Sequence, residues 1–175
     1  MKISVVGFSG SGKSSFAYKL SQLYQIDVTY IDKLQFLTNW EERDSSIRNM
    51  LLDEAIEKDS FIIDGNYQSI GIKRFERSDH IFIFNFNRWK CLYGAVLRRI
   101  KYHGKTRRSM TEGNKEKLDF EFIWWILFKS RTRKRKKFYK DLKIMYPTQT
   151  IEFKNRKQVN RYLLQLGIHD FKEKS

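Results

Sequence analysis

The stretch GFSGSGKSS, Gly7–Ser15, follows a short apolar run and precedes a segment with helical periodicity. It has the spacing G-x-x-x-x-G-K-[ST], which places Gly12, Lys13 and Ser14 at its end. Glycines let the backbone turn so that successive N–H groups point at one phosphate, and the positive end of the following helix strengthens that field. The pattern therefore predicts a phosphate-binding loop between a strand and a helix.

The residue types in this loop indicate separate roles. We expect Lys13 to reach the β- and γ-phosphates of ATP and Ser14 to bind Mg²⁺. The expected nucleotide-binding set is Gly7, Ser9, Gly10, Ser11, Gly12, Lys13, Ser14 and Ser15. The alternative is a glycine-rich turn that binds nothing, which the flanking strand and helix patterns disfavour.

Strand-like and helix-like patterns alternate along the whole chain. The apolar runs predict strands at 2–8, 28–32, 61–64, 81–86 and 150–153, and the periodic segments predict helices at 13–24, 42–58, 88–101, 118–145 and 156–166. This alternation predicts an α/β fold, a three-layer α/β/α sandwich around a five-stranded parallel sheet. With the phosphate-binding loop after its first strand, the sheet is expected to be of the P-loop NTPase type. Ligands of such sheets bind at the carboxyl ends of the strands.

The basic excess is concentrated in one region. Lysine and arginine total 35 against 20 acidic residues, a net charge of +15, and Arg98–Lys143 alone holds 17 basic and 5 acidic residues. Cys91 is the only cysteine, which excludes an internal disulfide and a cysteine-based zinc site. The chain opens on a strand-like run rather than a signal peptide, and the run FIWWILF, 122–128, is far shorter than the roughly 20 residues of a membrane span. We therefore expect a cytoplasmic protein without a membrane partner.

Five motifs carry a family resemblance that extends over nearly the whole chain. They are GFSGSGKSSFAYKL from Gly7, IDKLQF from Ile31, FIIDGNY from Phe61, RWKCLYGAVLRR from Arg88 and GKTRRSMTEGNKEKLDFEFIWWI from Gly104. With them the chain resembles the small P-loop proteins called DNA topology modulation proteins, which are similar in fold to adenylate kinase. The resemblance implies one kinase-like domain over 1–175, a small helical lid inserted at about 101–117, and a link to DNA topology.

Two aspartates end predicted strands. Asp64 closes the run FIID, where a carboxylate can hold the waters around Mg²⁺, and IDG resembles the equivalent stretch of adenylate kinases. The alternative is a turn aspartate before Gly65. Asp32 ends the second strand, and in kinases of this fold a carboxylate there contacts the acceptor. We expect Asp32 to be the general base or acceptor anchor, with helix capping as the alternative.

The acceptor side departs from the adenylate kinase pattern. Those enzymes carry an arginine shortly after the DG pair that binds the acceptor nucleotide's phosphate, whereas this chain continues DGNYQS, 64–69. Asn66 and Tyr67 are therefore candidates for acceptor contacts. Arg48 is a candidate for the missing charge, with Arg43 and Arg74 as further options and a solvated helix position as the alternative for each.

Arginines in and around the lid are the remaining candidates. In kinases of this shape, the lid and the helix after it contribute arginines that neutralise charge on the transferring phosphoryl group. The candidate catalytic residues are Lys13, Asp32, Arg98, Arg99, Arg107 and Arg131. The alternative for the arginines is that their stems lie along apolar surface with the charged heads in water. Arg108 and Ser109 stand where relatives have a proline and an acid, so lid closure is expected to differ.

The basic segment Lys129–Lys140 falls within the predicted helix 118–145. At 100° per residue, Arg131 and Arg135 share a face with apolar residues and are expected to point toward the core and the nucleotide. The opposite face is expected to be solvated or, as the alternative, to contact nucleic acid, and it holds Arg133, Lys136 and Lys137.

Together these features predict an ATP-binding phosphotransferase that moves the γ-phosphate of MgATP to a nucleotide or another small acceptor, with ATP and Mg²⁺ as cofactors. The alternative function is a nucleic-acid-binding ATPase that modulates DNA topology and contacts nucleic acid through the basic helix. MgATP carries a charge of roughly −2, so ATP alone does not require the basic excess of the Arg98–Lys143 region.

Overall fold

In the computed structural model, which describes residues 1–68, 70–116 and 118–169, five strands form one parallel sheet in the order β2-β3-β1-β4-β5. The strands are β1 (Lys2–Gly7), β2 (Val28–Tyr30), β3 (Phe61–Asp64), β4 (His80–Phe84) and β5 (Thr150–Phe153). The central strands are buried on both faces, which explains why their sequences are continuous apolar runs. The predicted five-stranded α/β sandwich is confirmed.

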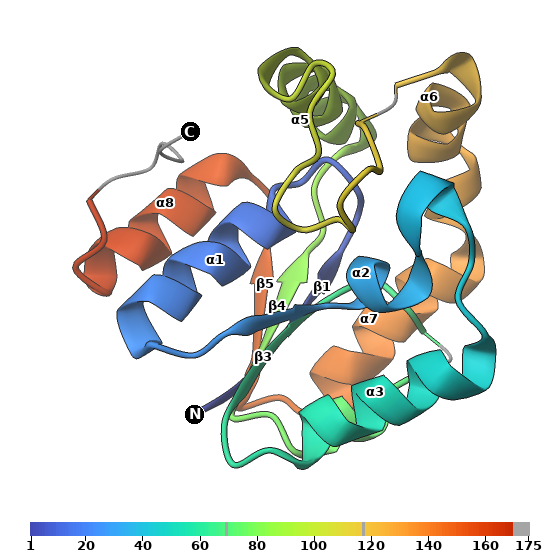
Figure 1. Ribbon diagram of the computed structural model, residues 1–175. Helices are drawn as coiled ribbons and strands as arrows, with labels where there is room; N and C mark the ends of the chain where they lie inside the picture. The colour runs from blue at the N-terminus through green and yellow to red at the C-terminus, as the bar shows by residue number, and fades with distance from the viewer. Residues whose placement is uncertain (69, 117, 170–175) are drawn as a thin grey trace.

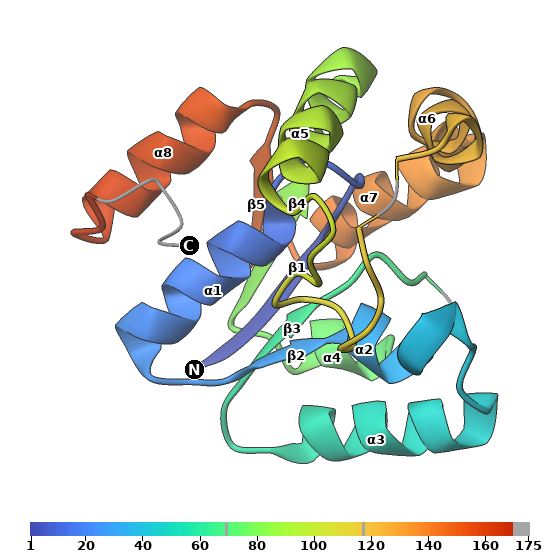
Figure 2. The same cartoon turned by 45° about the horizontal axis from the view of Figure 1, so that its top comes forward.

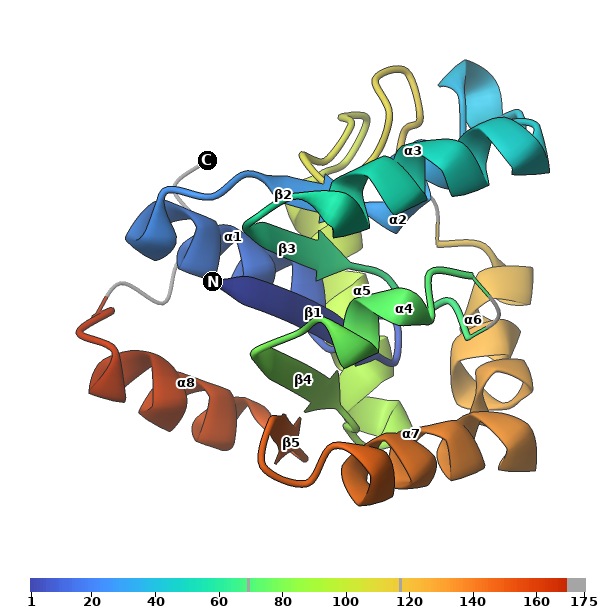
Figure 3. The ribbon, with the colours of Figure 1, turned by 90° about the horizontal axis from the view of Figure 1, so that it is seen from below.

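Helices cover both faces of the sheet. Figure 1 shows α1 (Lys13–Tyr24) and α8 (Arg156–Gln165) on one side, and α3 (Ser45–Glu57) and α7 (Arg133–Met145) on the other. The view from below in Figure 3 shows the twisted strands between these two layers. The shorter helices are α2 (Ile31–Gln35), α4 (Lys73–Glu76) and α6 (Phe120–Leu127), with single 3₁₀ turns η1 (Thr38–Trp40) and η2 (Lys129–Arg131).

The carboxyl edge of the sheet is covered by the segment between α5 (Arg88–Lys101) and α6. Figure 2 shows this segment leaving α5, descending in front of the strand ends toward α2, and returning to α6. We call its described residues, 102–116 and 118–119, the lid. The sequence predicted a small helical lid at 101–117, but the described lid residues form turns, and Lys117 lies outside the described residues.

Strand register places the site at this edge. Val5 of β1 pairs with Asp64 of β3 and with Phe82 of β4, so the last residues of β1 lead into the phosphate loop beside the Asp64 carboxylate. The rings of Phe16, Phe82 and Phe153 pack together under α1 and hold that helix on the sheet. In the described part of the chain no helix is long and apolar enough to span a bilayer.

The predicted single helix 118–145 is wrong. The chain breaks after α6 at Phe128, whose φ of −129° and ψ of −64° are not helical, and α7 begins only after Thr132. The Ser130 hydroxyl donates to the Ile126 carbonyl, and the Thr132 hydroxyl accepts from the Arg135 N–H as the N-cap of α7. Because Arg131 lies in the 3₁₀ turn η2 and Arg135 in α7, the single helical face expected to hold both does not exist.

One strand end and one helix start also differ from the predicted bounds. The second strand ends at Tyr30, so Asp32 lies in the first turn of α2 rather than at the end of a strand. Helix α3 begins at Ser45 because the Asp44 carboxylate accepts from the N–H groups of Ser46 and Ile47 and caps the helix there.

Candidate active site

The phosphate loop is formed by backbone packed closely against backbone. Gly7 has a φ of +140°, and a Cβ there would lie 2.4 Å from the Phe84 carbonyl oxygen. A Cβ on Gly10 would lie 2.0 Å from the Cys91 carbonyl oxygen, and one on Gly94 in α5 would lie 2.1 Å from the Gly10 carbonyl oxygen. Only glycine fits at these contacts, so α5 directly supports the loop.

The loop leads into α1 through Gly12, whose φ of +87° is left-handed and which forms the N-cap of the helix. Ser11 is buried and donates to the Phe8 carbonyl at 2.6 Å, which closes the turn. The Lys13 ammonium donates to the same carbonyl at 3.0 Å. Burial lowers the pKa of Lys13, and the nearby carboxylates of Asp64 and Asp32 partly offset that shift.

Ser14 and Asp64 form a pair that fits a magnesium ion. The Ser14 hydroxyl donates to Asp64 Oδ2 at 2.6 Å, whereas Asp64 Oδ1 is buried without a hydrogen-bond donor among the described residues. Burial raises the pKa of Asp64, and Lys13 and the Ser14 hydroxyl partly offset that shift. A hydroxyl beside a carboxylate with an unsatisfied oxygen is the hard-oxygen donor set that Mg²⁺ prefers, directly or through water.

Asp32 faces the same cavity from α2. Its Oδ1 accepts from the Tyr67 hydroxyl at 3.3 Å, and its Oδ2 lies 3.7 Å from Arg107 Nη2 of the lid. Burial, followed by the charge of Asp32, raises the pKa of Tyr67, so the phenol remains a neutral donor. Asn66, one residue earlier, accepts from the Tyr139 hydroxyl of α7 at 2.6 Å. These contacts connect α2, the loop after β3 and α7 around one end of the cavity.

A buried carboxylate in the lid holds two of the predicted arginines. Glu116 Oε1 accepts from Arg98 Nε at 2.7 Å, and Glu116 Oε2 lies 3.3 Å from Arg107 Nε. Both guanidinium groups line the cavity, and burial together with the charge of Arg107 lowers the pKa of Arg98 to about 10. Glu116 therefore brings together two cations that would otherwise repel each other.

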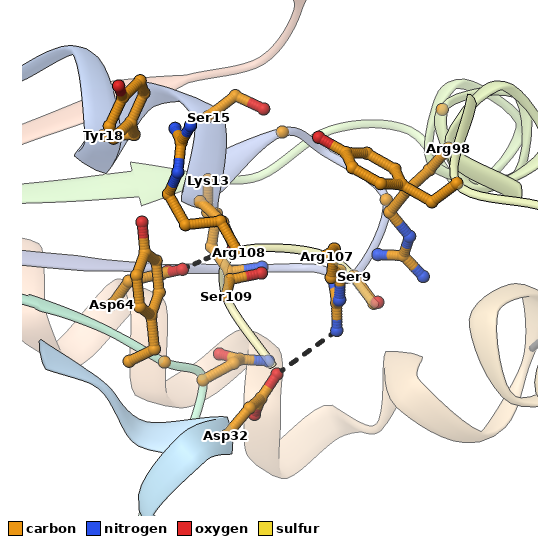
Figure 4. Close-up of a pocket in the computed structure, with 18 of the residues that line it drawn as sticks. Ser9, Lys13, Ser15, Tyr18, Asp32, Asp64, Arg98, Arg107, Arg108 and Ser109 are labelled. Atoms are coloured by element: carbon orange, nitrogen blue, oxygen red, sulfur yellow. Dashed lines mark hydrogen bonds and ion pairs between the residues drawn. The ribbon is translucent and has the colours of Figure 1, made fainter. Parts of the chain in front are cut away.

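Further contacts hold the lid over the cavity. The Asn114 side chain donates to the Leu37 carbonyl at 2.7 Å and accepts from the Trp40 N–H at 2.7 Å, which ties the lid to the turn after α2. On the other side, the Arg108 guanidinium lies over the Tyr18 ring of α1, 3.5 Å from its centroid. Figure 4 shows Arg107 directed at Asp32 and Arg108 passing above Asp64.

The cavity enclosed in this way has a volume of about 620 Å³, within the range of small-molecule sites. It brings together most of the predicted residues: Ser9, Gly10, Gly12, Lys13, Ser14, Ser15, Asp32, Asp64, Asn66, Tyr67, Arg98 and Arg107. Gly7 and Ser11 shape the phosphate loop from beneath it.

Other predicted residues lie outside the cavity lining. Arg99 donates to the Glu116 carbonyl at 3.0 Å, and Arg48 donates to Gln35 Oε1 at 2.8 Å. Arg131 lies over the Phe8 ring and donates to the Phe86 carbonyl at 2.7 Å, so it supports the segment beneath the phosphate loop. Arg74 is fully buried, and its Nη2 donates to the carbonyls of Gly65 and Tyr67.

Several cavity residues were not among the predicted site residues. Among them are Tyr18, Tyr30, Gln68, Lys101, Arg108, Trp125 and Arg156, whereas Arg135, which was expected to point toward the core and the nucleotide, does line the cavity. Arg156, at the start of α8, donates to the Ser11 carbonyl at 3.0 Å across a sequence separation of 145 residues. The available signal for it was a basic residue at the start of the helix that follows the last strand, because that turn lies at the carboxyl edge of the sheet.

The comparisons with known proteins bear on the fold. No protein-family model matches the chain, and no curated protein matches its sequence. Among solved structures, the chain is similar to a crystal structure of shikimate kinase from Bacteroides thetaiotaomicron, with a TM-score of 0.51 and 17% identity over 95% of each chain. At that identity the likeness concerns the fold alone, and the chain has the five-stranded parallel sheet with helices on both faces that is consistent with a P-loop kinase-like α/β fold.

Proposed function

We propose that this protein is an ATP-dependent kinase that transfers the γ-phosphate of MgATP to a hydroxyl group of a small acceptor. The observation that carries the proposal is the convergence of Lys13, the Ser14–Asp64 pair and Asp32 in one cavity beneath a lid. Asp32 is close enough to influence the pKa of both Lys13 and Asp64. The resemblance to DNA topology modulation proteins and the shikimate kinase-like fold are both compatible with this activity.

In the proposed reaction, Lys13 and the loop N–H groups hold the β- and γ-phosphates. Bound Mg²⁺, held by Ser14 and Asp64, would neutralise charge on these phosphates. The acceptor oxygen bonds to the γ-phosphorus while the bond from that phosphorus to the β-phosphate oxygen breaks, and the hydroxyl proton passes to Asp32. Arg98 and Arg107 face the charge that develops on the transferred group.

The test is a transfer screen with labelled ATP against nucleosides, nucleotides, sugars, polyols and the ends of DNA and RNA. Lys13→Ala should abolish both MgATP binding and transfer. Asp32→Asn should lower kcat by roughly 10²- to 10⁴-fold and leave MgATP affinity within about twofold, because it removes a proton acceptor and not a phosphate contact. The matched control is Asp27→Asn, an exposed acid before β2. Wild-type kcat in Asp32→Asn would exclude the base role.

A second candidate function is nucleic-acid binding through α7. The observation that favours it is the row of exposed basic side chains Arg133, Lys134, Lys136, Lys137 and Lys140. If these five side chains each neutralise a DNA phosphate, the slope of log K against log salt should be about −4 to −5. Replacing Lys136 and Lys137 by glutamine should then reduce that slope by about 2. A shallow slope that is unchanged in the variant would exclude this function.

A further inference from the structure

The outward side of α5 carries an exposed apolar stripe. Trp89, Tyr93, Val96 and Ile100 follow one another at spacings of four, three and four residues, which places them on one face of this helix. Trp89 is 64%, Tyr93 66% and Ile100 68% exposed. Exposed apolar side chains are ordinary when they stand singly, whereas a row of four along one helix indicates a docking surface.

The rotation of α5 is fixed by its other sides. Cys91 and Ala95 are buried in the core, and a Cβ on Gly94 would meet the backbone of Gly10 in the phosphate loop. Because these contacts leave the helix no freedom to turn about its axis, the stripe is held toward the outside of the molecule.

Helix α6 extends this apolar surface. It packs against α5, and Figure 2 shows both helices at the same end of the molecule. Phe120 and Trp124 are exposed on α6, and the rings of Trp124 and Phe128 lie 4.3 Å apart. The guanidinium of Arg88, the residue before Trp89, lies 5.6 Å from the centroid of the Phe128 ring and so joins the end of α6 to the stripe. We call the seven exposed side chains the apolar face: Trp89, Tyr93, Val96, Ile100, Phe120, Trp124 and Phe128.

The charges beside the apolar face are mostly positive. Helix α5 contains five basic residues and no acidic one. Lys90 and Lys129, both exposed, directly follow Trp89 and Phe128 in the chain, and the acidic residues of this region are confined to the start of α6. With a net charge of +15 on the whole chain, a second copy would be repelled, so charge complementarity favours an anionic partner.

The side chains of the apolar face suit a lipid surface better than a nucleic acid. Val96 and Ile100 offer no ring on which a base could stack, and the rings of Trp124 and Phe128 already contact each other. Tryptophan and tyrosine beside lysine are the side chains that hold proteins at the boundary between acyl chains and headgroups.

We propose that the apolar face docks on a membrane surface that contains anionic phospholipids. Trp89 and Tyr93 enter the boundary between headgroups and acyl chains, and Lys90 and Lys129 lie near the lipid phosphates. This is peripheral binding, distinct from a membrane span, which no helix among residues 1–68, 70–116 and 118–169 is long and apolar enough to form. It requires no step of the proposed kinase reaction and can be measured without nucleotide.

The test is co-sedimentation of the protein with sucrose-loaded vesicles of phosphatidylcholine alone or of phosphatidylcholine with about 30% phosphatidylserine. We expect the anionic vesicles to bind the protein roughly 10- to 100-fold more tightly than the neutral ones. Added salt should weaken the binding to anionic vesicles, because it screens the lysines from the headgroups.

Two pairs of substitutions assign the binding to the apolar face. Trp89→Ser combined with Ile100→Ser should lower the affinity for anionic vesicles by roughly tenfold or more, because less apolar surface is removed from water. The matched control is Ile47→Ser combined with Met50→Ser, an exposed apolar pair on α3 at the other end of the molecule, which should bind as the wild type does. The urea unfolding midpoint of each variant reports whether the fold is intact.

Tryptophan fluorescence separates insertion from simple adsorption of a basic protein. Lipids with brominated acyl chains quench a tryptophan that reaches the acyl region, so binding to such vesicles should quench the wild-type fluorescence. Trp89→Phe keeps an apolar ring and should retain vesicle binding, but the quenched share of the emission should fall.

Four results would overturn the proposal. Equal affinity for neutral and anionic vesicles, or no vesicle binding, would remove the anionic lipid. Wild-type affinity in the Trp89→Ser, Ile100→Ser protein would assign the binding to the basic row of α7. Equal quenching in Trp89→Phe and the wild type would show that this residue does not insert. Self-association or oligonucleotide binding that this pair abolishes, without vesicle binding, would assign the apolar face to a second copy or to nucleic acid.

Discussion

The phosphate loop and the lid both deliver positive groups to one cavity, but they are constructed differently. In the loop, backbone packs on backbone, and Gly10 and Gly94 leave no room for a Cβ. In the lid, the described residues lack regular secondary structure, and side chains from distant segments hold it in place. The loop contacts are set by sterics, whereas the lid contacts depend on a few polar groups such as Glu116 and Asn114.

This difference predicts different consequences of mutation. A change in the loop should affect stability and nucleotide binding together, because the loop is part of the packed core between β1, α1 and α5. A change in the lid should affect the arrangement of the arginines and leave the core intact, because lid contacts are local and polar.

The largest stability effect should come from Gly94→Ala. Helix propensity alone would make this change stabilising by about 1 kcal/mol. The added Cβ would lie 2.1 Å from the Gly10 carbonyl oxygen, so we expect a net loss of about 1–3 kcal/mol in the free energy of unfolding and weaker MgATP binding. Urea unfolding and calorimetry measure the two quantities, and Lys90→Ala at an exposed position of α5 is the control. A stabilised Gly94→Ala protein would show that the loop does not rest on α5.

Glu116→Gln should affect the rate of transfer and not the fold. Loss of the carboxylate leaves Arg98 and Arg107 without the group that orients them, so we expect kcat to fall by roughly 10- to 100-fold. If no acceptor substrate is known, the weaker stabilisation of the transferring phosphoryl group should appear as a lower affinity for MgADP–aluminium fluoride, while the affinity for MgADP stays the same. Glu112→Gln, an exposed lid acid, is the matched control. Equal loss of affinity for both ligands would instead indicate a structural role.

The smallest effect concerns the pH dependence of magnesium binding. Burial raises the pKa of Asp64 above the ordinary value of 3.8, so in the free protein its protonated form persists to higher pH than for an exposed aspartate. Because Mg²⁺ binds the deprotonated carboxylate, its contribution to nucleotide affinity should be present at high pH and should decline as pH falls through the raised pKa. Calorimetric titration of ATP with and without Mg²⁺ across acidic and neutral pH measures this. A magnesium effect that is constant down to the ordinary aspartate pKa would contradict it.

The cavity residues whose positions followed from the sequence are specified locally. Strand β1, the glycines, Lys13 and Ser14 occupy consecutive positions, so their spacing already specifies a strand, a turn and a helix. Asp64 was predicted because it ends an apolar run, and strand ends in a parallel sheet meet at one edge.

The parts that the sequence could not predict depend on contacts between distant segments. Arg131 and Arg135 were assigned together to one inward helical face. The break at 128–132 separates them, so Arg135 lines the cavity and Arg131 supports the segment beneath the phosphate loop. Likewise, nothing in the lid sequence distinguishes Glu116 from the exposed Glu112, because burial of Glu116 results from its pairing with Arg98 of α5.

The sequence by itself determined the fold class and the position of the glycine-rich loop, because hydrophobic periodicity and glycine spacing act over a few residues and are independent of the rest of the chain. Only the tertiary structure decided which of the many basic residues face the cavity. An arginine side chain is long enough to turn toward the cavity, toward a backbone carbonyl or toward solvent, and the choice depends on acceptors supplied by segments far away in sequence.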